Sequence, residues 1–342
     1  MIRQQRKDRS GRGPWNHRAP AALAAAFAAL AFGAGGAPAQ EPVKFGEVPT
    51  VANVGLYVAM EKGFFARRGI RVETERFASA GKMNTALSTG ELDGAAGAAS
   101  AGLFNAVATG ADIRIVLATG ILRPGSSYSM LVLRKDLAEG GRIRQVRDLK
   151  GLRLAAFAKG TITDYILDQI LEHGGISQKD VDMQYLGPPS IVKALAGKAI
   201  DGGILAEPWV ARAEAEGVAV RFALTDPVPS LKDHQNAYIL FGGKFRRERH
   251  DVARRFAQAY VDGVAYYTDR GGARDEEILT ILSKTIGTDK ESLRRSTPVV
   301  LQRDGRPDLD GLGRMQEWFL KRGMQEKRVA LDQVVDVQFL SR

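Results

Sequence analysis

The sequence predicts an α/β protein of two lobes, in which strands and helices alternate along most of the chain. Three observations predict this fold class. The 342 residues suggest about two domains by size alone. Short apolar runs typical of strands alternate with segments of helical periodicity from residue 43 to residue 241. Residues 86–94 are echoed at residues 194–202, as expected if the second lobe repeats the plan of the first.

The first 39 residues have the pattern of a secretory signal peptide. Six basic residues and one acidic residue lie within the first 20 positions, and residues 21–36 are nearly all Ala, Leu, Phe and Gly. This apolar run is shorter than the roughly 20 residues that a membrane span needs. Ala37-Pro38-Ala39 fits the small-x-small cleavage rule, so we expect the mature chain to begin at Gln40.

Charge and cysteine content exclude several classes of function. The full chain carries a net charge of +10, and the six basic residues and one acid of the signal region account for +5 of it, which leaves +5 for the rest. No Arg/Lys cluster with interleaved aromatics follows, so no nucleic-acid partner is expected. The chain has no cysteine, which excludes Cys-ligated zinc, thiol catalysis, disulfides and a lipid-anchored Cys. We therefore expect a soluble, monomeric periplasmic protein with no cofactor and no bound metal.

Residues 43–73 predict the βαβ unit on which the rest of the chain builds. A strand from Val43 to Val48 is followed by apolar positions at helical spacing from Val54 to Met60, and Ile70 to Val72 read as a second strand. The loop between them, Pro49 to Asn53, opens where parallel sheets hold ligands. Thr50 and Asn53 are therefore candidate ligand-binding residues.

The run ANVGLYVAMEKGFFARRGIRVE at residues 52–73 resembles the opening of solute-binding proteins of ABC importers. The branch in question includes the nitrate, sulfonate and taurine receptors and the thiamine-precursor (NMT1-like) relatives. The resemblance implies a type II periplasmic-binding-protein fold with two hinge crossings and a C-terminal helical extension. It also implies a small-molecule ligand and an ABC transporter permease as the membrane partner.

Further strand, loop and helix units are predicted to complete the first lobe. Strands are expected at Leu92–Ala98 and Ile113–Ala118, with a helix at Lys82–Thr89. Polar or small residues follow these elements at positions that face the ligand crevice in an open α/β sheet. They are Ser79 and Ala80 in the loop Phe77–Gly81, Ser100, and Thr119.

The second lobe is predicted to begin with a strand at Arg153–Phe157, a loop and a helix at Thr161–Glu172. The loop residues Lys159, Gly160 and Thr161 admit two interpretations. Thr161 can be an ordinary N-cap, or the free amides of the helix start can hold an anionic ligand; both can be true. The spacing does not match a Walker loop, so no nucleotide phosphate is expected.

The internal echo pairs Asp93 with Asp201, and Ala99-Ser100 with Glu207-Pro208. Ser100 and Glu207 should then lie at equivalent strand ends and face one cleft. Glu207-Pro208-Trp209 also matches the Glu-Pro-Trp element that receptors of the resembled family carry in their second lobe. Glu207 is expected to accept from a ligand donor or to pair with Lys159, and Trp209 to cover an apolar part of the ligand. The alternative is that these residues only start a helix and pack.

The predicted boundaries place lobe one at residues 43–128 and 236–342, and lobe two at residues 129–235. The two crossing segments are expected at Ser129–Leu131 and Gln235–Tyr238, with Asn236 near the hinge. Beyond the second crossing the pattern becomes helical. Helices are predicted at His250–Arg270, Asp275–Lys284, Asp310–Lys321 and Leu331–Leu340.

Together these features predict a substrate-binding protein that closes on its ligand by hinge bending, and not an enzyme. The chain after the signal region contains no Gly-x-Ser-x-Gly, His-Glu-x-x-His or Gly-x-Gly-x-x-Gly motif. His173, His234 and His250 are predicted to be solvated. A thiamine-precursor-synthase-like enzyme and a periplasmic ligand-sensing domain on the same fold stay open as alternatives. The ligand can be a sulfonate, nitrate, a carboxylate or a heterocycle.

Overall fold

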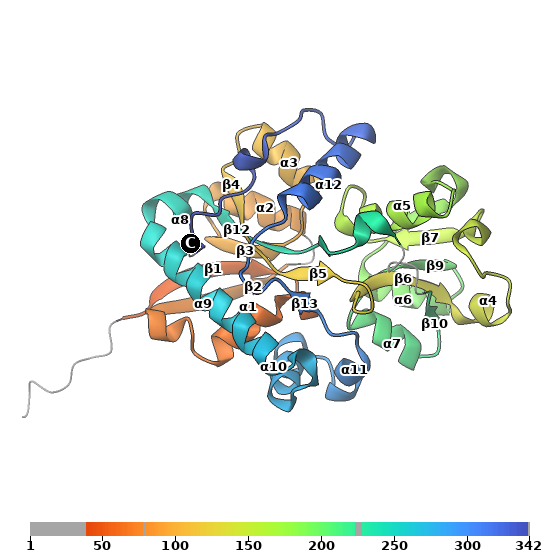
Figure 1. The fold of residues 1–342 in the computed structure, drawn as a ribbon, viewed down its shortest axis with the longest axis horizontal. Helices are drawn as coiled ribbons and strands as arrows, with labels where there is room; N and C mark the ends of the chain where they lie inside the picture. The colour runs from red at the N-terminus through yellow and green to blue at the C-terminus, as the bar shows by residue number, and fades with distance from the viewer. Residues whose placement is uncertain (1–38, 78–79, 223–227, 341–342) are drawn as a thin grey trace, which may run out of the picture. The chain divides into compact units, whose positions relative to one another are not determined.

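The computed structural model (Figure 1) describes residues 39–77, 80–222 and 228–340. Two of its sheets share one strand order. The first sheet has the order β2-β1-β3-β12-β4 and the second has the order β8-β7-β9-β6-β10. In each sheet the fourth strand, β12 or β6, runs antiparallel to both of its neighbours. The second sheet therefore repeats the plan of the first.

Lobe one denotes the first sheet with the helices packed on it, and lobe two the second sheet with its helices. The strands of lobe one are β1 (Glu41–Glu47), β2 (Ile70–Arg76), β3 (Gly94–Gly97), β4 (Ile113–Ala118) and β12 (Tyr238–Gly242). Those of lobe two are β6 (Ser129–Arg134), β7 (Arg153–Ala156), β8 (Asp182–Tyr185), β9 (Gly202–Ala206) and β10 (Ala219–Arg221). The first helices are α1 (Val54–Glu61), α2 (Ala80–Thr89) and α3 (Ala101–Ala108) in lobe one, and α4 (Lys135–Glu139), α5 (Ile162–His173), α6 (Pro188–Ala196) and α7 (Trp209–Ala215) in lobe two.

The predicted βαβ unit at residues 43–73 is confirmed, because β1 pairs in parallel with β2 and α1 connects them. The predicted equivalence of Asp93 and Asp201 is also confirmed. The backbone N–H of Asp93 donates to the carbonyl of Lys44, and the Lys44 N–H donates to the Asp93 carboxylate at 2.9 Å. Asp201 exchanges the same two hydrogen bonds with Arg153, whose N–H lies 2.9 Å from the carboxylate. Each Asp thus fixes the start of a central strand in its own lobe.

The first of the two predicted crossings between the lobes differs from the one in the structure. Ser129–Leu131 lies in β6 and pairs with β9, inside the sheet of lobe two, so the prediction that this segment flexes between the lobes is wrong. The chain leaves lobe one through β5 (Gly120–Leu122) and returns through β11 (His234–Gln235), and these two strands pair with each other. A third strand, β13 (Val300–Leu301), pairs with the other edge of β5 and was not predicted. From Gln40 onward the described chain forms one compact unit.

The core of lobe one is built around the long helix α9 (His250–Asp269). The ring of Phe256 packs against Phe45, Phe65 and Phe241 at centroid distances of 5.3, 4.7 and 5.5 Å. α9 also packs closely on α1, because a Cβ atom at Gly263 would lie only 2.2 Å from the carbonyl oxygen of Gly55. Glycine at this position lets the two helix backbones approach.

The C-terminal region contains α8 (Gly243–Glu248), α9, α10 (Glu276–Ile286), α11 (Lys290–Arg295) and α12 (Leu309–Lys321). The helices predicted near residues 250–270, 275–284 and 310–321 are confirmed. The helix predicted at Leu331–Leu340 is wrong, because only a 3-10 turn at Leu331–Gln333 forms. The chain beyond it runs beside β4 instead, where the Ile115 N–H donates to the Val334 carbonyl at 2.7 Å.

Candidate functional site

The predicted loop of lobe two meets the predicted strand end of lobe one. Gly160 has a φ of +69°, a left-handed conformation that glycine adopts at low cost. Its carbonyl accepts a hydrogen bond of 3.0 Å from the N–H of Ala101, the first residue of α3. The loop Lys159–Thr161 and the residue Ser100 therefore converge, and each stands at the start of a helix.

Ser100 and Thr161 lie at this meeting point, and their hydroxyl groups form different hydrogen bonds. Ser100 is the N-cap of α3, and its Oγ accepts from the Leu103 N–H at 3.2 Å, so its proton stays available for a ligand. Thr161 stands at the N-cap position of α5, but its Oγ1 donates to the Ala158 carbonyl at 2.7 Å and caps no helix amide. Thr161 thus occupies the predicted N-cap position of α5, but its side chain does not form the capping hydrogen bond.

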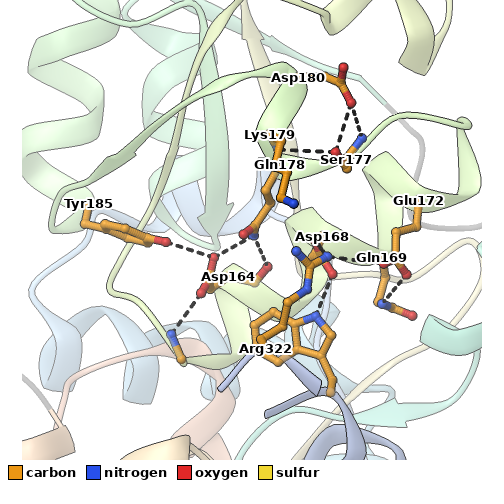
Figure 2. A network of polar contacts seen from close by, with 12 residues as sticks. Asp164, Asp168, Gln169, Glu172, Ser177, Gln178, Lys179, Asp180, Tyr185 and Arg322 are labelled. Atoms are coloured by element: carbon orange, nitrogen blue, oxygen red, sulfur yellow. Dashed lines mark hydrogen bonds and ion pairs between the residues drawn. The ribbon is translucent and has the colours of Figure 1, made fainter. Parts of the chain in front are cut away.

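Asp164 positions the loop from the interior of α5, a role that no feature of the sequence indicated. Its buried carboxylate accepts from the Gly160 N–H at 2.9 Å, from Gln178 Nε2 at 2.8 Å and from the Tyr185 hydroxyl at 3.4 Å (Figure 2). Burial raises the pKa of Asp164, and these donors oppose the increase. Since the Gly160 N–H is already paired, that amide does not face a ligand in this state.

Glu207 is buried and binds Arg221 instead of the predicted Lys159, which is exposed. Arg221 Nη2 lies 2.9 Å from Glu207 Oε1, and the same oxygen accepts from the Thr297 N–H at 2.9 Å. The other carboxylate oxygen accepts from the Ala211 N–H at 3.1 Å. Burial raises the pKa of Glu207, while the Thr297 amide and Arg221 counteract it. Both oxygens are thus engaged within the protein, and Thr297 extends this contact to the C-terminal region.

Trp209 is the first residue of α7 and packs beside Arg212 of the same helix. The guanidinium of Arg212 lies 5.3 Å from its ring. Trp209 lines a cavity of about 310 Å³ together with Thr288, Asp289 and Ser292 of the C-terminal region. Neither Ser100 nor the loop Lys159–Thr161 lines this cavity. The structure therefore does not bring Trp209 and Thr161 into one cavity.

The end of β1 carries a buried carboxylate that the sequence interpretation missed. Glu47 is 1% exposed, and its Oε2 accepts from Tyr57 Oη at 2.6 Å and from Asn53 Nδ2 at 3.2 Å. Among the described residues, no Lys, Arg or His forms an ion pair with it. Burial and the charge of Glu47 raise the pKa of Tyr57. The sequence did contain a signal for this buried carboxylate, because an acidic residue ends an apolar strand just before the predicted ligand loop. Thr50 lies in that loop and accepts from the Ala52 N–H at 3.5 Å.

Thr119 and Asn236 lie at the hinge, as predicted. The Thr119 N–H donates to the Ala237 carbonyl at 2.9 Å, and the Asn236 N–H donates to the Gly120 carbonyl at 3.1 Å. The Asn236 side chain accepts from the Tyr128 hydroxyl. The Thr119 hydroxyl is buried and has no partner within the described part of the chain. Both residues join the strands that connect the lobes, and their contact with a ligand stays a prediction.

Two of the predicted site residues cannot be placed fully. Ser79 lies outside the described residues, and Ala80 is the first residue of α2.

Among the histidines, His173 and His250 are exposed as predicted. The prediction for His234 is wrong, because its ring is fully buried and packs at a tilt against the Tyr165 ring, with a centroid distance of 5.2 Å. Burial lowers the pKa of His234 to about 4, so the ring is neutral at pH 7.

A family model described as the NMT1-like family matches residues 36–283. The chain belongs to the NMT1-like family. The bicarbonate transport ATP-binding protein CmpC of Synechocystis is 30% identical over 196 residues, which cover 53% of this chain and 28% of that protein's length. The match thus spans little more than a quarter of this curated relative.

Solved structures show that the NMT1-like chain has the fold of periplasmic binding proteins. The ligand-binding component of an ABC-type import system from Staphylococcus aureus, with zinc bound, matches with a TM-score of 0.74 at 17% identity, over 88% of this chain and 98% of that one. The alkanesulfonate-binding protein SsuA from Xanthomonas axonopodis, bound to MOPS, matches with a TM-score of 0.67 at 20% identity, over 87% and 99%. The nitrate-binding protein NrtA from Synechocystis matches with a TM-score of 0.67 at 17% identity, over 87% and 85%.

The described residues offer neither a membrane-spanning helix nor a metal site. No helix there is both long and apolar enough to cross a bilayer. Within the same ranges, no three His, Asp or Glu side chains are grouped so that they could hold a metal ion. The same fold also occurs in the desulfurization enzyme DszB, with a TM-score of 0.62 at 17% identity, so the fold by itself does not separate binding from catalysis.

Proposed function

We propose that this NMT1-like protein is the extracytoplasmic substrate-binding component of an ABC importer. It captures a small organic or anionic solute between its lobes, in the periplasm and as a monomer, and delivers it to a membrane permease. One observation carries the proposal: two lobes of equal strand order are joined by a hinge sheet and meet at strand-end loops through the Ala101–Gly160 hydrogen bond. The sulfonate- and nitrate-binding neighbours of the same fold support it.

The proposed mechanism is capture by hinge closure. A solute that makes contacts with both lobes binds the closed form better than the open form, so it shifts the population toward closure. The strands β5 and β11 are the elements whose backbone angles change, because they connect the sheets and belong to neither. The permease then recognises and binds the closed form of the protein.

The ligand contacts are proposed to come from the starts of α3 and α5. The first amides of a helix lack acceptors within it and carry partial positive charge, so they suit an anionic group of the solute. Ser100 supplies a hydroxyl proton, and the exposed Lys159 supplies a cation that forms no ion pair among the described residues. Sulfonate, nitrate, carboxylate and heterocyclic solutes all remain candidates.

Replacing Thr161 by alanine is expected to weaken solute binding by about tenfold or more and to leave folding nearly intact. A charge-assisted hydrogen bond contributes about 1.5 to 3 kcal/mol, and the Thr161 hydroxyl would exchange its bond to the Ala158 carbonyl for one to the solute. Trp209→Ala is expected to weaken binding less than Thr161→Ala, because the Trp209 ring lines a different cavity in this structure. Calorimetry with a solute found by thermal-shift screening measures both effects, with Thr280→Ala on an exposed turn of α10 as the control. Unchanged affinity in both variants would show that Thr161 and Trp209 only turn the chain and pack.

No observation on the described residues favours catalysis over binding. His234 is neutral and buried, and the other two histidines of the described chain are exposed. An enzyme of the DszB type would convert its solute during incubation, whereas a receptor returns it unchanged. Mass spectrometry of the solute recovered from the complex separates the two functions.

A further inference from the structure

We propose that α12 is a latch between the lobes. Its face bearing Trp318 and Arg322 binds Asp168 on α5 and holds the lobes closed before any solute arrives. This inference rests on the proposed two-lobe binding function and adds a regulation of the same site.

The first step is that α12 belongs to lobe one. The Phe319 ring packs on Phe104 of α3 at 5.9 Å, and Asn105 Nδ2 of α3 donates to the Met324 carbonyl at 2.9 Å. The segments before and after α12 are bonded to β4 as well. The Ala118 N–H donates to the Gly305 carbonyl at 2.8 Å, and the Ile115 N–H donates to the Val334 carbonyl. Both ends of the segment are therefore fixed to the sheet of lobe one.

The second step is that α12 binds lobe two through a buried charge. The Asp168 side chain is fully buried in α5. Its Oδ2 accepts from Trp318 Nε1 at 2.5 Å, and its Oδ1 accepts from Arg322 Nη2, which also lies 3.2 Å from Glu172 (Figure 2). The Tyr165 ring meets the edge of Trp318 at 5.4 Å. Tyr165, Asp168 and Glu172 are spaced by three and four residues, so they form one face of α5.

The third step connects this contact with the solute site. α5 begins directly after Thr161, so the helix that carries Asp168 also carries the predicted ligand loop. The turn after α12 touches that loop, because a Cβ atom at Gly160 would lie 3.4 Å from Met324 Sδ and 3.1 Å from Ala101 Cβ. α12 thus contacts both helices whose first turns form the proposed site.

Opening the lobes must break this contact, since Asp168 moves with lobe two while Trp318 and Arg322 stay with lobe one. An Asp carboxylate buried in this way needs its donors, because a buried charge without a partner is costly. The latch therefore shifts the balance between open and closed forms toward the closed form. It also predicts that solute enters at the rate at which the latch opens.

The test measures the distance between the lobes in the solute-free protein. The chain has no cysteine, so Ser88→Cys in α2 and Lys193→Cys in α6 give one spin label in each lobe. We expect Arg322→Gln and Asp168→Asn to raise the ratio of open to closed molecules at least tenfold in double electron–electron resonance. Trp318→Phe, which keeps an aromatic ring of smaller size and removes the N–H, should shift the ratio in the same direction by less. The control Arg328→Gln removes an exposed ion pair with Glu317 elsewhere in the same region and should change nothing.

A distance distribution that is the same in all variants would overturn the latch, and so would an equal shift in the Arg328→Gln control. Circular dichroism checks that each variant is folded, and the three latch variants supply independent tests should one of them unfold. No solute is needed for this measurement. A protein that binds none of the candidate solutes would therefore contradict the proposed function without changing the outcome for the latch.

Discussion

Replacing Gly263 with alanine is expected to lower the free energy of unfolding by about 3 kcal/mol, the upper part of the usual range for overpacking a core. The added Cβ would lie 2.2 Å from the Gly55 carbonyl oxygen and 2.9 Å from Ala59 Cβ. The first of these atoms is backbone of α1, so no side-chain rotation can relieve the clash. α9 must move away from α1, and the packing around Phe256 loosens with it. Urea unfolding monitored by circular dichroism measures the loss.

Gly313→Ala in α12 is the matched control for this experiment. A Cβ atom at Gly313 would meet nothing closer than Leu331 Cδ1 at 3.8 Å, which is ordinary van der Waals contact. Since alanine favours a helix over glycine by up to about 1 kcal/mol, this variant should be as stable as the parent or more stable. If the two variants had the same stability, α1 and α9 could not be as close as the structure places them.

The second large effect is expected for Asp201→Asn, with a loss of about 2 to 3 kcal/mol at pH 7. The Asp201 carboxylate accepts from Arg153 Nη2 at 2.8 Å, from Arg134 Nη1 at 3.0 Å and from the Arg153 backbone. Breaking a buried pair costs about 3 to 5 kcal/mol, but the Arg153 side chain is 40% exposed, so solvent screening reduces the figure. Asp93→Asn tests the equivalent position of lobe one, where Arg249 is the one arginine among the described residues that pairs with the carboxylate. Its loss should be smaller.

The pH dependence of the Asp201 effect has a definite sign. Burial alone would raise the pKa of Asp201, but the hydrogen bonds and charges of Arg153 and Arg134 lower it below its ordinary value. A lowered folded-state pKa gives stability that is fully present above the unfolded value of about 3.9 and is lost as the pH falls through the folded pKa. The difference between parent and Asp201→Asn should therefore be constant from pH 7 to pH 5 and shrink below about pH 4. A difference of unchanged size at the lowest pH that still permits folding would contradict this account.

The alternation of strands and helices could be predicted because it depends on local periodicity. The echo around Asp93 and Asp201 was also predictable, since the same backbone contacts require the same residue at the same place in both lobes. Residues 331–340 could not be predicted from periodicity. Their apolar residues Val334, Val335 and Phe339 are buried, but they lie in a segment paired with β4, some 220 residues earlier in the chain. Helical spacing in the sequence does not reveal such a distant partner.

The meeting of the strand-end loops was predictable from the sequence, but the hydrogen bonds that they form were not. Residues at strand ends could be located, and Ala101, next to Ser100, does bond to Gly160. The partners of Glu207 could not be inferred, because Thr297 lies 90 residues away and reaches the site only through the C-terminal fold. Asp164 was missed for a different reason: an acid inside an amphipathic helix looks like a solvated residue until the loop that it holds is known.

The central claim is that a small solute is captured between the lobes and released unchanged. A thermal-shift screen of the chain from Gln40 onward tests it most directly, with sulfonates, carboxylates, nitrate, bicarbonate and heterocycles as the panel. A solute present at 100 times its dissociation constant adds about 2.7 kcal/mol, so we predict that at least one class raises the melting temperature by several degrees and is recovered chemically intact. No shift with any class, or recovery of a reaction product in place of the solute, would contradict the account.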